Sequence, residues 1–469
     1  MEYPIIQYSI IIIYFALIII KGVSKSKAIK DDEDFLVAGR NIGWFLLLAT
    51  MSATVIGGGS SIGAIGKTYE RGILMLVVIT GWYFQFMFSA KYVAPYFREA
   101  KLYTVAGFFE HRFDRKNRFV AFILSLVFSV GILGAQMVAF GKIINSMMPE
   151  IPYDVAVIIG GSIVILYSTA GGLLAVIYTD VYQFIILMAG FIITAIMVAP
   201  DIFAHTTEIM EQVPKTFFQI DGGKGYIFLI STFLAFLLGE TFAPGYATRF
   251  CVGKNIEETK KGIFRAGLFL LLTFPILLFF ISLYAKFNFP NIDPEQALPH
   301  VILKLHNPVI GGIIIAALMS AVMSSADSIL NSTTAIFTKD FYEQYFAKNN
   351  VNPRRGLKIA RASSVILGIS GIVLALAVPN IIDLLLLTYS VWAPTIILPI
   401  LIGVFSKKKN PTLNRNVFIT MVGSIVLTII YMIFFNNETL QPTVFGVFCS
   451  LIIYFTTTMF LGKVKIRPE

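Results

Sequence analysis

Charged side chains are scarce in this sequence. Aspartate, glutamate, lysine and arginine make up only 14% of the 469 residues, whereas 57% of the residues are hydrophobic and the mean hydropathy is +0.78. Soluble domains carry about 25% charged residues. The composition therefore excludes an ordinary soluble domain and predicts a protein that lies largely within a lipid bilayer.

Cysteine and histidine are also few, and their positions exclude several kinds of chemistry. Cys251 and Cys449 are far apart in the chain, so we expect neither a disulfide bond nor a metal site. The histidines fall in loops or at loop edges, without the spacing of metal ligands and without a paired nucleophile: His111, His205, His300 and His306. We therefore do not expect an enzyme.

Long apolar runs account for most of what is present. A bilayer core about 30 Å thick needs roughly 20 apolar residues per helix, and thirteen runs are long enough. They lie near residues 4–20, 42–65, 72–97, 119–147, 152–170, 172–198, 226–248, 263–289, 308–338, 362–378, 381–405, 417–435 and 443–461. The pattern predicts an all-α polytopic membrane protein with thirteen transmembrane helices in a single transmembrane domain.

Basic residues are distributed unevenly between the two sides of this topology. If the amino terminus lies outside, 29 of the 37 lysines and arginines fall in or beside inner loops, and the carboxyl terminus lies inside. The formal net charge of +10 is then explained by topology and contact with anionic lipid, rather than by a nucleic-acid partner. By this topology, no lysine or arginine is expected at mid-depth.

Two of the predicted spans are interrupted by residues that break helices. The second span contains VIGGGSS, residues 55–61, and the seventh contains GETFAPG, residues 239–245. Glycine costs about 1 kcal/mol relative to alanine in a helix, and proline removes a backbone hydrogen bond. Such breaks survive in a bilayer only where they are buried in protein or line a cavity. Close packing of glycine-bearing helices is the simpler alternative, but it does not explain two breaks separated by five spans.

This spacing favours a transporter built from two inverted repeats, with its site at the breaks. Spans 2–6 form one half and spans 7–11 the other, so each half begins with a broken helix. The predicted organisation is an extra amino-terminal helix and inner loop (1–41), a first repeat (42–198), a second repeat (226–405) and two carboxyl-terminal helices (406–469).

Acidic residues inside the spans are candidates for function, because a buried charge is costly in a bilayer. Asp383 begins a span near the outer face and is explained by that position. At 1.5 Å per residue, Asp180 lies about 12 Å from the inner face, whereas Asp327 and the backbone at Ala53 each lie about 16 Å from it. Three helices thus place polar or unwound positions at similar depth, which predicts an ion site.

The ninth span carries a face of small and hydroxyl-bearing residues. Ala321, Ser324, Ser325 and Ser328 follow the helical spacing i, i+3, i+4 and i+7. Sodium is a hard cation that prefers oxygen ligands, and both hydroxyls and the freed carbonyls of a broken helix supply them. An isolated serine more often bonds back to its own helix, but this group lies beside an aspartate at the matching depth.

Several motifs resemble those of the sodium:solute symporter family. AALMSAVMSSADSILNSTTAIFTKDFY, residues 316–342, resembles the family's ninth-span signature, and STAGGLLAVIYTDVYQ, residues 168–183, resembles its motif GG-x-x-(A/S)-V-x-x-T-D-x-x-Q. ATVIGGG resembles the unwound first core helix, and YATRFCVGKN matches the end of the seventh span. The similarity extends over essentially the whole chain.

This resemblance implies the leucine-transporter fold, with two inverted five-helix repeats and alternating access driven by sodium. The implied sodium ligands are the carbonyls of Ala53, Ile56 and Ala321 and the hydroxyls of Ser324 and Ser325. A second cation site, present in some members, would involve Asp180, Ser324 and Ser328. Members with that site typically have serine where this chain has Asp327, which could strengthen the site or hold a proton instead.

The family's solute-binding positions fall on five spans of this chain. They correspond to Gly57, Gly58, Ser60, Thr80, Tyr83, Gln136, Glu240 and Tyr389. We expect the glycine run to leave backbone N–H groups open toward the solute, and Glu240, about 21 Å from the outer face, to accept a hydrogen bond or charge from it. The alternative is a glutamate that is protonated or paired internally and holds the broken helix together. Phe236, Phe242 and Tyr246 could flank a cation or serve only as packing residues.

The sequence therefore predicts a symporter that couples inward Na⁺ movement to uptake of a small polar organic solute across the cell (inner) membrane. The coupling ion is the only cofactor expected, and a monomer is expected to suffice for transport. Proton coupling through Asp180 and Asp327 is the main alternative. A non-transporting sensor is the other, which we disfavour because about eight residues follow the last span.

Overall fold

The computed structural model describes residue 6, residues 8–13 and 16–17, and residues 40–168, 173–347, 353–406, 410–435 and 439–461. These residues are helical, apart from loops and an isolated bridge between Ile42 and Gly253. Among them, eight helices are long and apolar enough to span a membrane, and counting each of two bent pairs as one span gives ten. Two shorter apolar helices cover Tyr153–Leu166 and Arg361–Ala377.

The prediction of an all-α polytopic membrane protein is confirmed. Of the predicted first span, 4–20, the structure describes residues 6, 8–13 and 16–17 as helical, and the other eight lie outside the described residues. The count of thirteen spans and the orientation of the termini therefore stay predictions.

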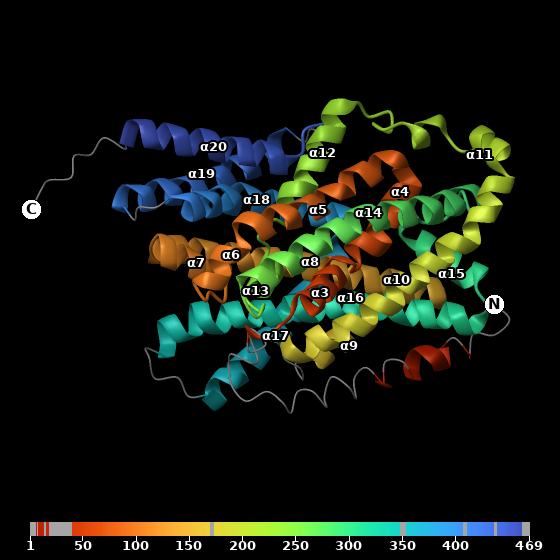
Figure 1. Ribbon diagram of the computed structural model, residues 1–469, viewed down its shortest axis with the longest axis horizontal. Helices are drawn as coiled ribbons and strands as arrows, with labels where there is room; N and C mark the ends of the chain where they lie inside the picture. The colour runs from red at the N-terminus through yellow and green to blue at the C-terminus, as the bar shows by residue number, and fades with distance from the viewer. Residues whose placement is uncertain are drawn as a thin grey trace, which may run out of the picture.

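The helices of the first half follow the predicted spans two to six (Figure 1). Their bounds are α3 Trp44–Val55, η2 Gly59–Gly63, α4 Ala64–Arg71, α5 Ile73–Tyr92, α8 Arg115–Met147, α9 Tyr153–Ser168 and α10 Leu173–Ala204.

The helices of the second half follow spans seven to eleven, and two more helices come after them. Their bounds are α12 Tyr226–Gly239, α13 Pro244–Phe250, α14 Ile256–Asn288, α16 Pro308–Ile336, η5 Phe337–Ala347, α17 Pro353–Ala377, α18 Ile381–Phe405, α19 Pro411–Phe434 and α20 Pro442–Leu461. Both α19 and α20 pack on α18, at the edge of the bundle in Figure 1.

The two halves pack in corresponding ways. In the first half α3 packs against α10, and it also packs against α14 of the second half. In the second half α12 packs against α18, and it also packs against α5 of the first half. The pairs α5–α14 and α8–α16 join equivalent helices of the two halves. This reciprocal pattern is the one that two inverted repeats produce.

Both interrupted spans are bent at their breaks. The axis turns by 60° between α3 and the η2–α4 segment, and by 52° between α12 and α13. The first break needs glycine because a Cβ atom at Gly57 would lie 2.5 Å from Ser325 Oγ of α16. In the second break Phe242 adopts a positive φ of 61°, and Pro244 begins α13, where its missing N–H costs nothing.

Short helices lie in the loops between the spans. The loop before α8 contains α6 Ala94–Glu99 and α7 Val105–Arg112. The loops after α10 and α14 contain α11 Thr206–Gln212, η3 Lys215–Phe218, η4 Pro294–Gln296 and α15 Ala297–Leu305. Of these, η4 lies directly on α4, because a Cβ atom at Gly66 would be 2.7 Å from the carbonyl oxygen of Pro294. The α4 end of the first broken span is therefore covered by η4.

Candidate sodium and solute sites

The break after α3 lies directly beside α16. Ser325 Oγ donates a hydrogen bond to the carbonyl oxygen of Thr54 at 3.2 Å. In the part of the chain that the structure describes, the carbonyl oxygens of Ala53 and Ile56 accept no hydrogen bond, because the helical ladder stops with the Ile56 N–H on the Ser52 carbonyl and resumes with the Ser61 N–H on the Gly57 carbonyl. Two unsatisfied carbonyls and a serine hydroxyl thus lie close together in the protein interior.

The five predicted sodium ligands are all buried, and they come from these two elements. Ala53 and Ile56 lie at the end of α3, and Ala321, Ser324 and Ser325 lie on α16. The Ser324 hydroxyl donates to Asp180 Oδ1 of α10. A third helix therefore joins this group, as the depth argument anticipated.

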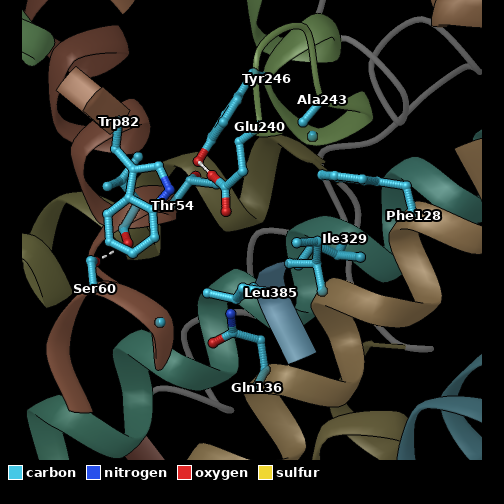
Figure 2. Close-up of a pocket in the computed structure, with 14 residues that line it drawn as sticks. Thr54, Ser60, Trp82, Phe128, Gln136, Glu240, Ala243, Tyr246, Ile329 and Leu385 are labelled. Atoms are coloured by element: carbon cyan, nitrogen blue, oxygen red, sulfur yellow. Dashed lines mark hydrogen bonds between the residues drawn. The ribbon is translucent and has the colours of Figure 1, made fainter. Parts of the chain in front are cut away.

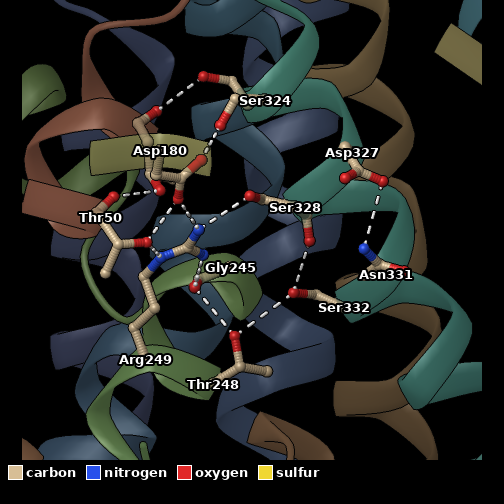
Figure 3. A network of polar contacts seen from close by, with 12 residues as sticks. Thr50, Asp180, Gly245, Thr248, Arg249, Ser324, Asp327, Ser328, Asn331 and Ser332 are labelled. Atoms are coloured by element: carbon tan, nitrogen blue, oxygen red, sulfur yellow. Dashed lines mark hydrogen bonds and ion pairs between the residues drawn. The ribbon is translucent and has the colours of Figure 1, made fainter. Parts of the chain in front are cut away.

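A fully buried arginine lies next to these residues (Figure 3). The Arg249 guanidinium of α13 donates to Thr50 Oγ1 at 3.1 Å, to the Gly245 carbonyl at 3.0 Å and to Ser328 Oγ at 2.8 Å. Its Nη2 also lies 3.3 Å from Asp180 Oδ2. The side chains of Asp180 and Arg249 are both 0% exposed, so this is a buried ion pair with several additional hydrogen bonds.

The expectation that no arginine or lysine lies at mid-depth is wrong. The 52° bend keeps α13 inside the protein, so Arg249 lies within a half-helix rather than in the inner loop. Its position five residues after the Pro244 break was the available signal, because a half-helix that starts at a proline continues for at least a turn.

The proposed second cation residues do not form one cluster around an open position. Asp180 and Ser328 are brought together, but both bond to the Arg249 guanidinium. Asp327 points away from them in Figure 3, and its Oδ1 accepts a hydrogen bond from Asn331 Nδ2 at 3.2 Å. Among the described residues, no group of three or more histidine, cysteine, aspartate or glutamate side chains could hold a metal ion.

A small cavity lies between the two breaks (Figure 2). Its volume is about 40 Å³, enough for about three water molecules. It is lined by Thr54, Val55, Gly59, Ser60, Trp82, Phe128, Ile132, Gln136, Glu240, Ala243, Gly245, Tyr246, Ile329 and Leu385. Residues from both broken spans and from α5, α8, α16 and α18 thus meet at one point.

Glu240 lines this cavity and is hydrogen-bonded by two tyrosine side chains. Tyr246 Oη donates to Glu240 Oε2 at 2.5 Å, and Tyr389 Oη donates to Oε1 at 2.6 Å. Trp82 Nε1 in turn donates to Tyr389 Oη at 3.0 Å. Glu240 is therefore hydrogen-bonded within the protein, as the alternative expectation had it, and also faces the cavity.

The other predicted solute residues divide between the cavity and its surroundings. Ser60 and Gln136 line it, whereas Thr80 bonds back to the Val77 carbonyl at 2.7 Å. The expected open N–H groups at the glycine run are partly occupied, because Gly58 N–H donates to Gln136 Oε1 at 2.8 Å.

Gly57 and Tyr83 are likewise buried without lining the cavity. Trp82 and Phe128 do line it but were not anticipated, since an aromatic residue on an apolar helix carries no signal of its own. Tyr246, considered beforehand, belongs to the lining.

A third buried carboxylate lies where η4 meets the start of α18. Glu295 Oε1 of η4 accepts a hydrogen bond from the Ile381 N–H, where α18 begins, at 2.6 Å. Its Oε2 lies 3.6 Å from Lys142 Nζ. Burial raises the pKa of Glu295 to about 7, although the Ile381 hydrogen bond and Lys142 act in the opposite direction. This group therefore titrates near neutral pH.

The sequence profile of the sodium:solute symporter family matches residues 35–413, and the chain belongs to this family. It is 26% identical over 460 residues to the sodium/glucose cotransporter of Vibrio parahaemolyticus, covering 90% of this chain and 84% of that one. It is 27% identical to the osmoregulated proline transporter OpuE of Bacillus subtilis, covering 81% and 79%. It is 26% identical to the sodium/sialic acid symporter NanT of Aliivibrio fischeri, covering 78% and 75%.

Solved structures share the fold. A Na⁺-coupled sialic acid symporter in a substrate-bound outward-open state superposes with a TM-score of 0.81 at 22% identity, covering 98% of both chains. The nucleobase-cation-symport-1 family transporter Mhp1, closed around bromovinylhydantoin, superposes with a TM-score of 0.61 at 13% identity, covering 92% and 96%. The expected leucine-transporter fold is confirmed.

The protein is therefore a multi-pass cell-membrane symporter that couples Na⁺ movement to uptake of an organic solute, and not an enzyme.

Proposed function

We propose that one sodium ion binds between the break after α3 and the facing side of α16. Its ligands are the carbonyls of Ala53, Ile56 and Ala321 and the hydroxyls of Ser324 and Ser325. The observation that carries this assignment is the pair of carbonyls, unbonded within the described chain, beside the Ser325 hydroxyl. A buried carbonyl without a partner is costly, and an alkali ion removes that cost.

The solute occupies the cavity on the other side of the same break. Thr54 and Val55 line that cavity, and both lie between the sodium ligands Ala53 and Ile56 in the chain. An ion that fixes this short segment therefore also fixes part of the solute site. Two ligands that stabilise one backbone conformation bind with positive coupling, which symport requires.

The transport cycle uses a single sodium ion, because the position of a second cation is filled by the chain itself. The Arg249 guanidinium lies against Asp180 and Ser328, the residues that a second ion would need. Its fixed charge and donors compensate Asp180 and repel another cation. Proton transfer through Asp180 is disfavoured for the same reason, because the arginine stabilises its charged form.

One chain contains both sites, so a monomer suffices for transport in this proposal. The repeats, residues 42–198 and 226–405, supply one broken span each. The additions at 1–41 and 406–469 supply none of the assigned ligands.

The test is a sodium titration of thermal unfolding with the purified full-length protein, using potassium as the reference ion. Ser325→Ala should raise the half-saturating sodium concentration about tenfold or more, because a hydroxyl ligand to a charge contributes about 1.5–3 kcal/mol. Ser370→Ala is the matched control, because Ser370 is partly exposed and its hydroxyl bonds to its own helix at Ile366.

A sodium dependence that is unchanged in Ser325→Ala would contradict the assigned site. A titration that requires two sodium ions, or uptake into proteoliposomes driven by a proton gradient without sodium, would contradict the single-ion mechanism.

A further inference from the structure

The central cavity has a net negative charge that comes from one residue. Among its fourteen lining residues, Glu240 is the only one whose side chain is ordinarily charged at neutral pH. The nearby buried base, Arg249, makes its ion pair with Asp180 and does not line the cavity. The charge of Glu240 is thus not cancelled by any other residue of the described lining.

The hydrogen bonds around Glu240 favour its ionised form. An indole N–H can only donate, so Trp82 must donate to Tyr389 Oη. The Tyr389 and Tyr246 hydroxyl hydrogens are then directed at the two carboxylate oxygens. A protonated Glu240 that donated to one tyrosine would leave that hydroxyl hydrogen without an acceptor. Both tyrosine hydroxyls therefore stabilise the charged form of Glu240.

The carboxylate still has room for another donor. An ionised carboxylate has about four lone-pair positions, and the two tyrosines use two of them. The accessible part of Glu240 faces the cavity, since the residue has intermediate exposure although it lies deep in the protein. A solute N–H⁺ or an alkylammonium group can therefore approach it directly.

Aromatic rings form the walls around this carboxylate. In Figure 2 the Trp82 and Phe128 rings lie on opposite sides of Glu240, and the Tyr246 ring lies above it. Aromatic faces attract cations, and the attraction is stronger where the cation is desolvated. Rings and an uncompensated carboxylate together are a suitable environment for a positive nitrogen. They are a poor one for a solute whose only charge is a carboxylate.

We propose that the transported solute carries a positively charged nitrogen, as a small organic cation or a zwitterion, which binds to Glu240 between the aromatic rings. This inference rests on the proposed function, because it places the solute in the cavity beside the α3 break. The remaining polar contacts, from Gln136 and Ser60, would bind the other end of the solute.

The test measures thermal unfolding of the purified full-length protein in sodium and in potassium with a panel of solutes. Choline and ethanolamine are the cations, proline is the zwitterion, glucose is neutral and lactate is the anion. We expect sodium-dependent stabilisation by at least one of the three solutes with a charged nitrogen and none by lactate. Glu240→Gln should weaken that binding about tenfold or more, as expected for a charge-assisted hydrogen bond. Glu257→Gln, at an exposed position on α14, is the matched control and should leave binding unchanged.

The outcomes separate the two proposals. Failure of sodium to stabilise the wild-type protein more than potassium does would contradict the sodium site, whichever solute binds. Sodium stabilisation without an effect of choline, ethanolamine or proline would overturn the charged-nitrogen inference and leave the sodium site intact. Equal binding of the solute by wild type and Glu240→Gln would also overturn it. If Glu240→Gln does not fold, the inference is decided by which solutes stabilise the wild-type protein in sodium: those with a charged nitrogen, or glucose and lactate.

Discussion

Two carboxylates are buried between the broken helices, and their surroundings differ in one respect. Asp180 has a cation of its own, the Arg249 guanidinium, together with Thr50 and Ser324. Glu240, within the described part of the chain, has only the neutral hydroxyls of two tyrosines. The first arrangement is electrically complete and holds four helices together, whereas the second leaves a charge that a ligand can neutralise. Burial of an acid therefore does not identify a binding site; the absence of an internal counter-charge does.

The largest loss of stability is expected when the Asp180–Arg249 ion pair is broken. Arg249→Met leaves Asp180 charged and buried without its partner, which should destabilise the protein by about 3–5 kcal/mol. Thermal unfolding and the yield of monodisperse protein would measure this. The double variant Asp180→Asn/Arg249→Met should recover part of the loss, because no unpaired charge remains. Equal stability of Arg249→Met and wild type would contradict the view that Asp180 depends on Arg249 as its counter-charge, whereas Glu240 has none among the described residues.

A smaller loss of stability is expected from a substitution at Gly57, where the break after α3 packs against Ser325 of α16. Gly57→Ala places a methyl group 2.5 Å from Ser325 Oγ, so that the serine must move away from the break. Overpacking of this kind costs about 1–3 kcal/mol, and the sodium requirement should rise as well. Gly245→Ala is the matched control, because a Cβ atom at that position would have no described atom within 4 Å. A sodium titration in which both variants behave alike would contradict the close approach of α3 and α16.

Glu295 is a buried carboxylate whose surroundings are intermediate between those of Asp180 and Glu240. It accepts one backbone hydrogen bond, and a lysine lies 3.6 Å away. Its pKa in the folded protein, about 7, is above the ordinary value of 4.5. The folded state therefore holds this proton more tightly, and that stabilisation is lost as the pH rises through 7. Between about pH 6 and pH 8 the loss should be about 1 kcal/mol. Unfolding temperatures of Glu295→Gln should depend less on pH over this range than those of wild type, and an identical pH dependence would count against the burial effect.

The smallest effect on stability is expected at Glu240. Glu240→Gln replaces one of the two acceptor oxygens by an amide donor, so one of Tyr246 and Tyr389 loses its acceptor, but no buried charge is left unpaired, and the cost should be about 1 kcal/mol. A loss as large as that of Arg249→Met would indicate that Glu240 serves to hold the second break together. Thermal unfolding in the absence of solute makes this comparison directly.

The parts of the site that could be predicted from the sequence are those with a local signature. Helix breakers in apolar runs indicated both bends, and the serine spacing on α16 indicated which face is polar. The depth argument brought together Asp180, Asp327 and Ala53. The three helices that carry them are neighbours in the structure, although Asp327 bonds to Asn331 and it is Ser324 that reaches Asp180.

The remaining parts depend on angles that the sequence does not encode locally. Arg249 reaches Asp180 only because α13 turns by 52° into the protein, and a count of residues per span assigned it to a loop. Trp82 and Phe128 face the cavity because of how α5 and α8 are rotated in the bundle. Rotation is set by packing over the whole helix, and an aromatic residue fits either orientation in an apolar environment.

The hydrogen bond from Ser324 to Asp180 has a consequence for how a cation is recognised. A hydroxyl that has given its hydrogen to a carboxylate presents only electron pairs to its other neighbours, and the carboxylate makes those pairs more negative. Asp180 and its arginine thus keep one serine oriented as an acceptor without themselves approaching the ion. Without Asp180 or Arg249, the Ser324 hydroxyl beside the break would be free to rotate.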